Sequence, residues 1–243
     1  MLPGLLSRAV AGALRERIEA QIGAARESRI WTALDRPSRQ DDVLRGFVRS
    51  PALGRLASGL IAGGRPEVDP GVRYWSDAAY IKMPAARQGA STPWHQDQPY
   101  RPYDRQGSLV VWIALNEVPP ARGSLRFFSG SHRLGSMGRH LNGDGFDTLD
   151  EYPWIADECE LSPALHLQPG DATVHSGVVV HSAPENATDE PRWVYTVTYM
   201  PAEALYNGMP HAEIDKLGLE INRPFDHPEF PIVHRGTTPG RPV

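Results

Sequence analysis

Two consecutive stretches decide the fold: GDATVHSGVVVHSAPEN at residues 170–186 and RWVYTVTYM at residues 192–200. Both are rich in β-branched and aromatic residues and are bounded by Gly, Pro, Asp or Asn, which is the pattern of strands separated by turns. We therefore predict strands at 171–181 and 192–200. The first strand ends in a histidine, His181, and a polar turn follows it.

The same pattern extends outward from these stretches over the centre of the chain. It predicts further strands at 72–83, 108–118, 124–128 and 163–168. Strands at this spacing, without long helices between them, favour a sandwich or barrel over a parallel α/β sheet. The expected fold class is therefore mainly β.

The two ends of the chain have a different character. Apolar residues at helical spacing predict a helix within 4–30 and a weaker one over 40–62. Prolines recur after residue 200, so we expect this extension to wrap the surface or fray. The predicted organisation is one domain over 1–243, made of a helical part (1–70), a β core (72–200) and a proline-rich extension (201–243).

Composition narrows the class of protein. The 243 residues carry a net charge of −4 with a sequence pI near 6.1, whereas a nucleic-acid binder usually shows a basic domain or stripe. The single cysteine, Cys159, cannot form an internal disulfide, which fits a reducing compartment. No apolar run is long enough to cross a bilayer. We expect a cytoplasmic protein that binds neither nucleic acid nor membrane; the sequence predicts no oligomeric state.

An acidic segment interrupts the β core. Residues 140–161 hold seven carboxylates and are predicted to form a long loop with about one turn of helix. Long loops in compact domains are often lids or binding loops. A solvated acidic loop is the simpler interpretation, and a preference for a cationic substrate is the alternative.

A short H-x-D motif is the first candidate for chemistry. His95 and Asp97 are separated by one residue, and in an extended strand residues i and i+2 point to the same face. An imidazole and a carboxylate could thus grip one metal ion. Similar triplets start at His211 and His227, but they lie in the proline-rich extension and no strand-borne His and Arg follow them, so we do not favour them as sites.

A second histidine, farther along the chain, would complete the ligand set. One imidazole–carboxylate pair with a distant imidazole is the two-His-one-carboxylate triad, which leaves open positions on Fe(II). Arg192, eleven residues beyond His181, offers a planar fork for the far carboxylate of a dicarboxylic cosubstrate. His175 competes with His181, but six residues of strand would separate them by about 20 Å. We favour His181 and expect His175 to face the core or to support the site.

These motifs, in this order, resemble the phytanoyl-CoA dioxygenase family of Fe(II)/2-oxoglutarate oxygenases. The resemblance covers roughly residues 72–200. It rests on His95-Gln-Asp97, on the strand Leu109–Leu115, on the stretch Gly123–His132 with its Gly-Ser-His end, and on Gly170-Asp171 followed by His181, Asn186 and Arg192.

The resemblance implies a fold and a set of cofactors. The fold would be a double-stranded β-helix, or jelly roll, of the cupin-like kind. Fe(II) would bind His95, Asp97 and His181, and 2-oxoglutarate would be held by Arg192. Lys82 and Trp112 align with positions that line the cosubstrate pocket in relatives, and O2 would be the second cosubstrate.

One position departs from the family pattern. Relatives often have His-Gly-Ser at the distal ligand, but this chain has His181-Ser182-Ala183. The serine that would help to hold 2-oxoglutarate is therefore missing from its usual place, and Ser182 either substitutes for it or does not.

Residues next to the metal motif are the predicted substrate contacts. Gln98, Tyr100 and Arg101 follow it directly, and Trp154 is a further candidate for the pocket wall. The implied reaction is hydroxylation of a C–H bond in a small molecule, with release of succinate and CO2. The short chain has no obvious basic clamp for a coenzyme A phosphate, which favours a free metabolite of specialised metabolism.

Other functions fit parts of the pattern. Desaturation, epimerisation and ring formation use the same triad, whereas a related halogenase would have Gly or Ala in place of Asp97. Two further alternatives are a non-catalytic jelly-roll binding protein and a hydrolase or isomerase that holds Zn2+ on the same residues.

Overall fold

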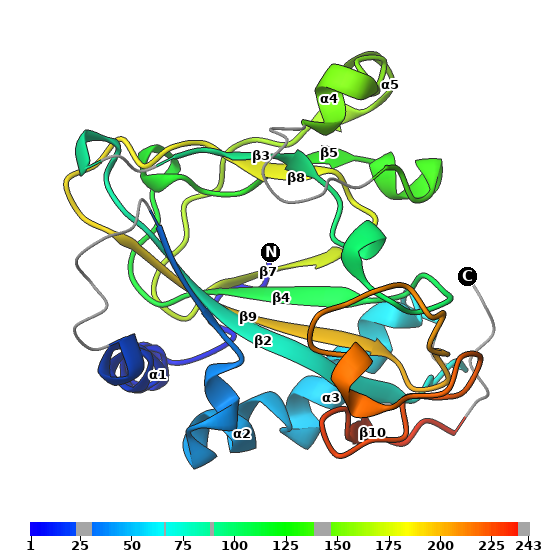
Figure 1. Cartoon of the computed structure of the whole chain (residues 1–243). Helices are drawn as coiled ribbons and strands as arrows, with labels where there is room; N and C mark the ends of the chain where they lie inside the picture. The colour runs from blue at the N-terminus through cyan, green and yellow to red at the C-terminus, as the bar shows by residue number, and fades with distance from the viewer. Residues whose placement is uncertain (23–30, 66, 88–89, 139–146, 238–243) are drawn as a thin grey trace.

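The elements of the chain are seen in a computed structural model that describes residues 1–22, 31–65, 67–87, 90–138 and 147–237 (Figure 1). The helices are α1 (Arg8–Ile22), α2 (Asp42–Val48), α3 (Pro51–Ile61), α4 (Thr148–Glu151) and α5 (Ile155–Glu158). The strands are β1 (Trp31–Asp35), β2 (Val72–Lys82), β3 (Thr92–His95), β4 (Leu109–Ala114), β5 (Arg126–Ser129), β6 (Glu160–Leu161), β7 (Ala172–Ser176), β8 (His181–Ala183), β9 (Arg192–Pro201) and β10 (Ile232–His234). Short 3-10 turns include η2 (Pro37–Arg39) and η4 (Gln98–Tyr100).

The strands form two antiparallel sheets that lie one above the other (Figure 1). The larger sheet has the order β1-β2-β9-β4-β7, with β10 also paired to β2, and the smaller has the order β3-β8-β5-β6. Helices α1, α2 and α3 cover the outer face of the larger sheet (Figure 1). The fold is mainly β with flanking helices, as the strand spacing predicts.

Strands β2 and β9 form the centre of the larger sheet. Their register runs from Val72 opposite Pro201 to Lys82 opposite Arg192, with one bulge near Trp75, and every residue of β9 is buried. Because successive side chains point to opposite faces of a strand, β9 has two different buried faces. Trp193, Tyr195, Val197 and Tyr199 pack with the helices, while the alternate residues face the second sheet.

A buried carboxylate ties the helical layer to this sheet. Asp77 of β2 is 1% exposed and accepts hydrogen bonds from the hydroxyls of Tyr195 (2.6 Å), Ser38 (2.7 Å) and Tyr74. The backbone N–H of Ser38 also donates to it. A buried charge is tolerated only where such donors satisfy it, so this network fixes η2 against β2 and β9.

The predicted helix over 40–62 is two helices, α2 and α3, because Pro51 separates them. Pro51 begins α3 and lacks an N–H, and its ring disfavours helical backbone at the preceding residue. Ser50 accordingly has an extended ψ of 130°, and its hydroxyl accepts from the N–H of Ala52 as an N-cap. The helix predicted within 4–30 is α1, and residues 23–30 lie outside the described part of the chain.

The strand predictions at 171–181 and 163–168 were wrong. The first is divided between β7 and β8, which belong to different sheets. In the second, the residue that bridges to another segment is Leu167, opposite Val118, and the short strand β6 lies just before it. The edge strands β1 and β10 were not predicted, because their pairing to β2 is set by tertiary contact rather than by a pattern of their own.

The proline-rich extension packs on the core over its described part, residues 201–237. Ile214, Phe225 and Phe230 are at most 1% exposed and form one cluster with Trp75 of β2. The Trp75 and Phe230 rings stack at 5.1 Å between centroids. Of the two expected behaviours, wrapping the surface or fraying, residues 201–237 therefore show the first, because the five aromatic rings of this cluster pack together.

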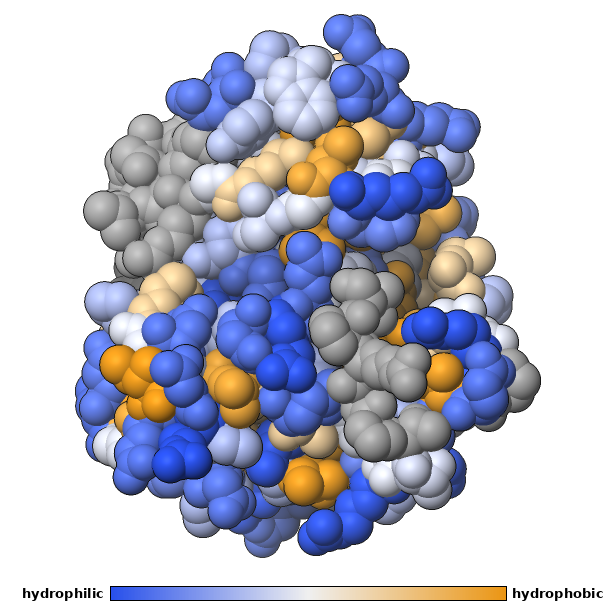
Figure 2. All heavy atoms as spheres, turned by 90° about the vertical axis from the view of Figure 1, so that its right-hand side faces the viewer, coloured by the Kyte–Doolittle hydropathy of each residue, from blue (hydrophilic) through white to orange (hydrophobic). Residues whose placement is uncertain are grey.

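In the described part of the chain no helix is long and apolar enough to cross a bilayer. Figure 2 shows one face of the molecule, which is mostly hydrophilic, with its apolar residues scattered.

We expect Gly170→Ala to destabilise the protein more than Gly130→Ala. Both glycines have a left-handed φ, +94° and +93°, so either alanine costs about 1–2 kcal/mol for the backbone conformation. At Gly170 the added Cβ would also meet the Leu6 carbonyl oxygen, whereas nothing lies within 4 Å at Gly130. Urea denaturation of both variants measures the difference; equal losses of unfolding free energy would contradict a tight contact with the N-terminal segment.

Candidate active site

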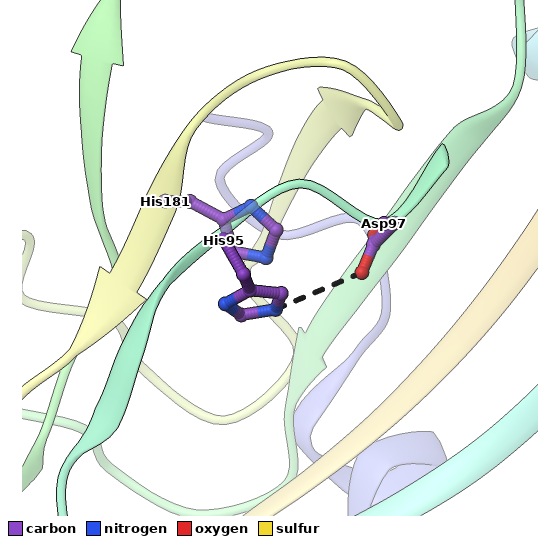
Figure 3. A group of neighbouring side chains, drawn as sticks. All are labelled: His95, Asp97 and His181. Carbon is purple, nitrogen blue, oxygen red and sulfur yellow. Dashed lines mark ion pairs between the residues drawn. The ribbon is translucent and has the colours of Figure 1, made fainter. Parts of the chain in front are cut away.

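Strands β3 and β8 bring the two predicted histidine ligands together. His95 lies directly opposite His181 in their register, and the ring centroids are 4.2 Å apart. Asp97 follows at the end of β3, with its Oδ1 3.8 Å from His95 Nε2 (Figure 3). One ligand atom from each of the three residues lies within 4.8 Å of the others. The fold thus gathers two imidazoles and a carboxylate at one point.

Backbone carbonyls fix the tautomer of both histidines. Nδ1 of His95 lies 2.8 Å from the Pro93 carbonyl oxygen, and Nδ1 of His181 lies 3.0 Å from that of Val179. A carbonyl oxygen only accepts, so each Nδ1 carries the hydrogen and donates it. In this tautomer the lone pair of the ring is on Nε2, which is the arrangement that orients a metal-binding histidine. Burial, followed by the neighbouring imidazoles, holds the pKa of His181 well below its ordinary value, so its ring is neutral near pH 7.

The two oxygens of Asp97 have different neighbours. Oδ1 faces His95, whereas Oδ2 lies 3.2 Å from Nη2 of Arg101 and 3.7 Å from Nε2 of His175. Burial by itself raises the pKa of Asp97, but the Arg101 guanidinium and the imidazoles outweigh it and hold the pKa well below its ordinary value. Asp97 is therefore a carboxylate with one oxygen held and the other directed at the histidines.

His175 lies beside the site, which corrects the separation expected from the sequence. Its ring centroid is 4.5 Å from that of His181, because the chain reverses in the turn between β7 and β8, where the N–H of Val179 donates to the Ser176 carbonyl. The estimate of about 20 Å required an unbroken strand. His175 is 6% exposed, and neither ring nitrogen has a hydrogen-bond partner among the described residues.

The residue between the two proximal ligands has a structural role that the motif did not reveal. The Gln96 side chain is buried and donates to the carbonyls of Val178 (2.7 Å) and Gly135 (2.9 Å). Its oxygen accepts from the N–H of Met137. Gln96 therefore ties the H-x-D segment to the turn that carries His181, which sets the two halves of the triad relative to each other.

Two cations lie opposite each other on β2 and β9. Lys82 and Arg192 are register partners, and each is 4% exposed. Lys82 Nζ donates to the carbonyls of Pro184 (2.8 Å) and Ala183 (3.0 Å) and to Thr92 Oγ1 (3.2 Å). Like charges directly opposite on neighbouring strands are destabilising, so an anion bound between Lys82 and Arg192 would reduce their repulsion.

The surroundings of Arg192 support the same interpretation. Its Nη1 donates to the Gly123 carbonyl, its guanidinium lies 5.3 Å from the centre of the Trp112 ring, and its buried Nε has no partner among the described residues. Burial lowers the pKa of Arg192 to about 10. Burial and the charge of Arg192 lower the pKa of Lys82 to about 7.

The distal ligand segment shows how the departure from His-Gly-Ser is accommodated. Ala183 faces the cavity and its carbonyl accepts from Lys82. Ser182 pairs with Arg126 of β5 and is not part of the cavity wall. Because alternate residues of β8 face opposite sides, Ser182 does not take the place of the missing serine.

A cavity of about 330 Å³ joins the triad to the two cations. Of the residues predicted from the sequence, its wall includes His95, Asp97, His181, Lys82, Trp112, Arg192 and Arg101. The wall also includes residues that the sequence did not single out, namely Tyr80, Thr92, Val110, Leu125, Thr196 and Thr198. Register with Arg192 could have found Thr196 and Thr198, since they continue the same face of β9.

Three predicted substrate contacts lie outside this wall. Gln98 is turned into the fold, where its oxygen accepts from Ser108 Oγ at 3.0 Å. Tyr100 and Trp154 are 36% and 40% exposed. For Gln98 and Tyr100, sequence proximity to the metal motif does not place the side chains in the cavity wall, because η4 turns the chain directly after Asp97. Trp154 lies at the start of α5.

The ligand atoms of His95, Asp97 and His181 indicate which metal the site suits. Two neutral imidazole nitrogens and one carboxylate oxygen are the facial ligands of mononuclear Fe(II) in oxygenases, and the paired cations fit a dicarboxylate. Two facing antiparallel sheets with these groups between them define a jelly-roll metalloprotein. The chain matches the family model "Phytanoyl-CoA dioxygenase (PhyH)" over residues 2–194 and belongs to that family of Fe(II)- and 2-oxoglutarate-dependent oxygenases. The resemblance and the fold predicted from the sequence are confirmed.

Three named proteins illustrate what this chain is similar to. A phytanoyl-CoA dioxygenase of Arabidopsis thaliana is 27% identical over 157 residues, which are 65% of this chain and about half (52%) of that protein. Methylphosphonate hydroxylase of Gimesia maris is 29% identical over 218 residues, 82% of this chain and 74% of the relative. The structure of the epimerase SnoN in complex with Fe3+, alpha ketoglutarate and nogalamycin RO has a TM-score of 0.75 at 25% identity and covers 96% of this chain and 93% of its own.

The triad geometry predicts that His181→Ala abolishes stoichiometric Fe(II) binding, whereas His175→Ala retains it. The ligand atom of His181 belongs to the group within 4.8 Å. The Nε2 of His175 instead lies 3.7 Å from Asp97 Oδ2, the oxygen that also faces Arg101. Anaerobic titration of metal-free protein with Fe(II), followed by 2-oxoglutarate, monitors the charge-transfer absorption that requires both. A band lost in His175→Ala and kept in His181→Ala would overturn this choice of third ligand.

Proposed function

We propose that this protein hydroxylates a C–H bond of a small-molecule metabolite, consuming 2-oxoglutarate and O2 and releasing succinate and CO2. The observation that carries the proposal is the meeting of three metal-ligand atoms at the wall of a cavity that also holds two buried cations, Lys82 and Arg192. Among the described residues, the Nε–H of Arg192 has no hydrogen-bond partner. His95, Asp97 and His181 would hold Fe(II). When bound, the metal and 2-oxoglutarate supply the oxidising chemistry, and the protein contributes position and exclusion of water.

The basic end of the cavity is proposed to hold the far carboxylate of 2-oxoglutarate. Arg192 presents a buried Nε–H without a partner, and Trp112 holds the guanidinium plane from one side. Lys82 adds a second cation directly opposite. A carboxylate here would relieve the repulsion between Lys82 and Arg192 and form charge-assisted hydrogen bonds.

Hydroxylation is preferred over other outcomes on the basis of a relative. Methylphosphonate hydroxylase covers most of this chain, while the similarity to the epimerase SnoN extends over the same fold at 25% identity. A small metabolite also suits a cavity near the lower end of the usual range for ligand pockets, about 300–1,000 Å³. We propose a cytoplasmic location because the single cysteine fits a reducing compartment.

Removal of the Arg192 side chain is expected to weaken 2-oxoglutarate binding while Fe(II) binding is retained. A lost charge-assisted interaction corresponds to about 1.5–3 kcal/mol, or roughly 10- to 100-fold in affinity. The dissociation constant of 2-oxoglutarate for Arg192→Ala, from the anaerobic charge-transfer titration, measures the change, and Arg192→Lys serves as the charge-preserving control. Unchanged affinity would refute the assigned role.

We expect the affinity for 2-oxoglutarate to fall as the pH rises above about 7. Lys82 has a pKa of about 7 in the unliganded cavity, and a carboxylate beside it would raise that pKa, so binding takes up a proton above pH 7 but not below it. The loss is at most about tenfold per pH unit, because one proton is linked. Titrations from about pH 6 to about pH 9 measure it, and Lys82→Met should remove the dependence; a slope that persists in Lys82→Met would assign it to another group.

A further inference from the structure

The cavity holds more positive charge than the proposed cofactors neutralise. Among the described residues of its wall, Lys82, Arg101 and Arg192 are basic and Asp97 is the one carboxylate. The charges of Fe(II) and of fully ionised 2-oxoglutarate cancel each other. Two positive charges therefore remain on side chains that are themselves mostly buried, and unneutralised charge away from water is costly.

Arg101 carries this excess on the side of the metal triad. Its Nη2 lies 3.2 Å from Asp97 Oδ2, and its side chain is 11% exposed. Lys82 and Arg192 instead bond to Pro184, Ala183, Thr92 and Gly123, and share no hydrogen-bond partner with Arg101 among the described residues. A carboxylate bound between Lys82 and Arg192 would thus leave Arg101 to a different ligand.

The guanidinium of Arg101 is held in place but not saturated. Of its five N–H groups, one approaches Asp97 and one donates to the Tyr103 hydroxyl at 3.3 Å. Tyr103 is 3% exposed and packs edge-on against Trp75 at 5.4 Å between ring centroids. A cation fixed on two sides loses little freedom on binding a ligand, which favours recognition of a planar or tetrahedral oxyanion.

We infer that the substrate is a small organic acid and that Arg101 binds its anionic group beside the metal triad. The inference rests on the proposed function, because it requires 2-oxoglutarate to occupy the basic end of the cavity between Lys82 and Arg192. A carboxylate and a phosphonate share the required chemistry, since each offers oxygen acceptors and negative charge. The cavity of about 330 Å³ must hold the cosubstrate as well, so the acid is small and its reacting carbon lies close to the acidic group.

A purely structural role for Arg101 is the competing explanation. In that case the guanidinium only balances Asp97, and the cavity would not distinguish an acid from its neutral amide. Acetate and acetamide are nearly isosteric and differ in charge, so they separate the two explanations. Methylphosphonate tests whether a tetrahedral oxyanion is accepted as well.

The experiment uses the full chain loaded anaerobically with Fe(II) and saturated with 2-oxoglutarate, so that the site between Lys82 and Arg192 is occupied. Calorimetric titration with acetate, acetamide and methylphosphonate measures equilibrium binding without turnover. We expect at least one of the two anions to bind and acetamide to bind at least about tenfold more weakly than that anion. Arg101→Gln should lower the affinity for the anion by roughly tenfold or more, and Arg101→Lys should retain part of that affinity.

Two outcomes would overturn the inference. One is binding of neither anion more tightly than acetamide at tens of millimolar; the other is anion binding that is unchanged in Arg101→Gln. If Arg101→Gln does not fold or loses Fe(II), two measurements still distinguish anion recognition from a purely structural role. They are the comparison of wild type with Arg101→Lys and the ratio of the wild-type affinities for the acid and its amide. The initial titration with Fe(II) and 2-oxoglutarate tests the proposed function separately, so a missing charge-transfer band would contradict that function rather than the role of Arg101.

Discussion

The pairing of β2 with β9 is the constraint on which both layers of the molecule depend. One face of this ladder carries Tyr195 and Tyr199 into the helical layer, where Asp77 and its hydroxyl donors lock the packing. The other face sets Lys82 directly opposite Arg192. That juxtaposition of like charges opposes folding, and it persists because apolar packing on the far side of the same strands supplies the stability that it removes. The strand pair thus combines a fully buried strand, β9, with two buried like charges that lie opposite each other.

Sequence reasoning succeeded where the pattern is local and failed where a tertiary contact decides. The run of β-branched and aromatic residues at 192–200 is a strand in its own right, and the predicted span matches β9 closely. The run 171–181 looks equally continuous, because Val178, Val179 and Val180 have high β propensity. The chain turns there through a hydrogen bond from the Val179 N–H to the Ser176 carbonyl, and the Gly177 N–H bonds to the Ser108 carbonyl. Nothing within the run indicates that contact.

This failure had a consequence for the candidate site. A spacing rule converts residues into distance only while the strand continues, so the break moved His175 from a predicted distance of about 20 Å to ring contact with His181. The pair His95 and Asp97 needed no such rule, because the two residues are close in sequence. Arg192 is indicated by its position after His181, and Lys82 by the resemblance. The burial of the Gln98 side chain against Ser108 and the packing of Tyr103 against Trp75 depend instead on contacts outside the motif. Local motifs thus predict which groups take part, and tertiary contacts decide what else reaches them.

The charge of the cavity differs in sign from the charge of the chain. The protein as a whole carries −4, yet the described cavity wall holds one acidic residue, Asp97, against one lysine and two arginines. Surface charges act over about 8–10 Å at physiological ionic strength before salt screens them, whereas buried or partly buried charges such as Lys82 and Arg192 are screened much less. An anionic ligand therefore gains its attraction after it enters, from Arg101 at one end and Lys82 and Arg192 at the other. Selectivity of this kind resides in bound-state contacts, so it affects the dissociation rate more than the rate of encounter.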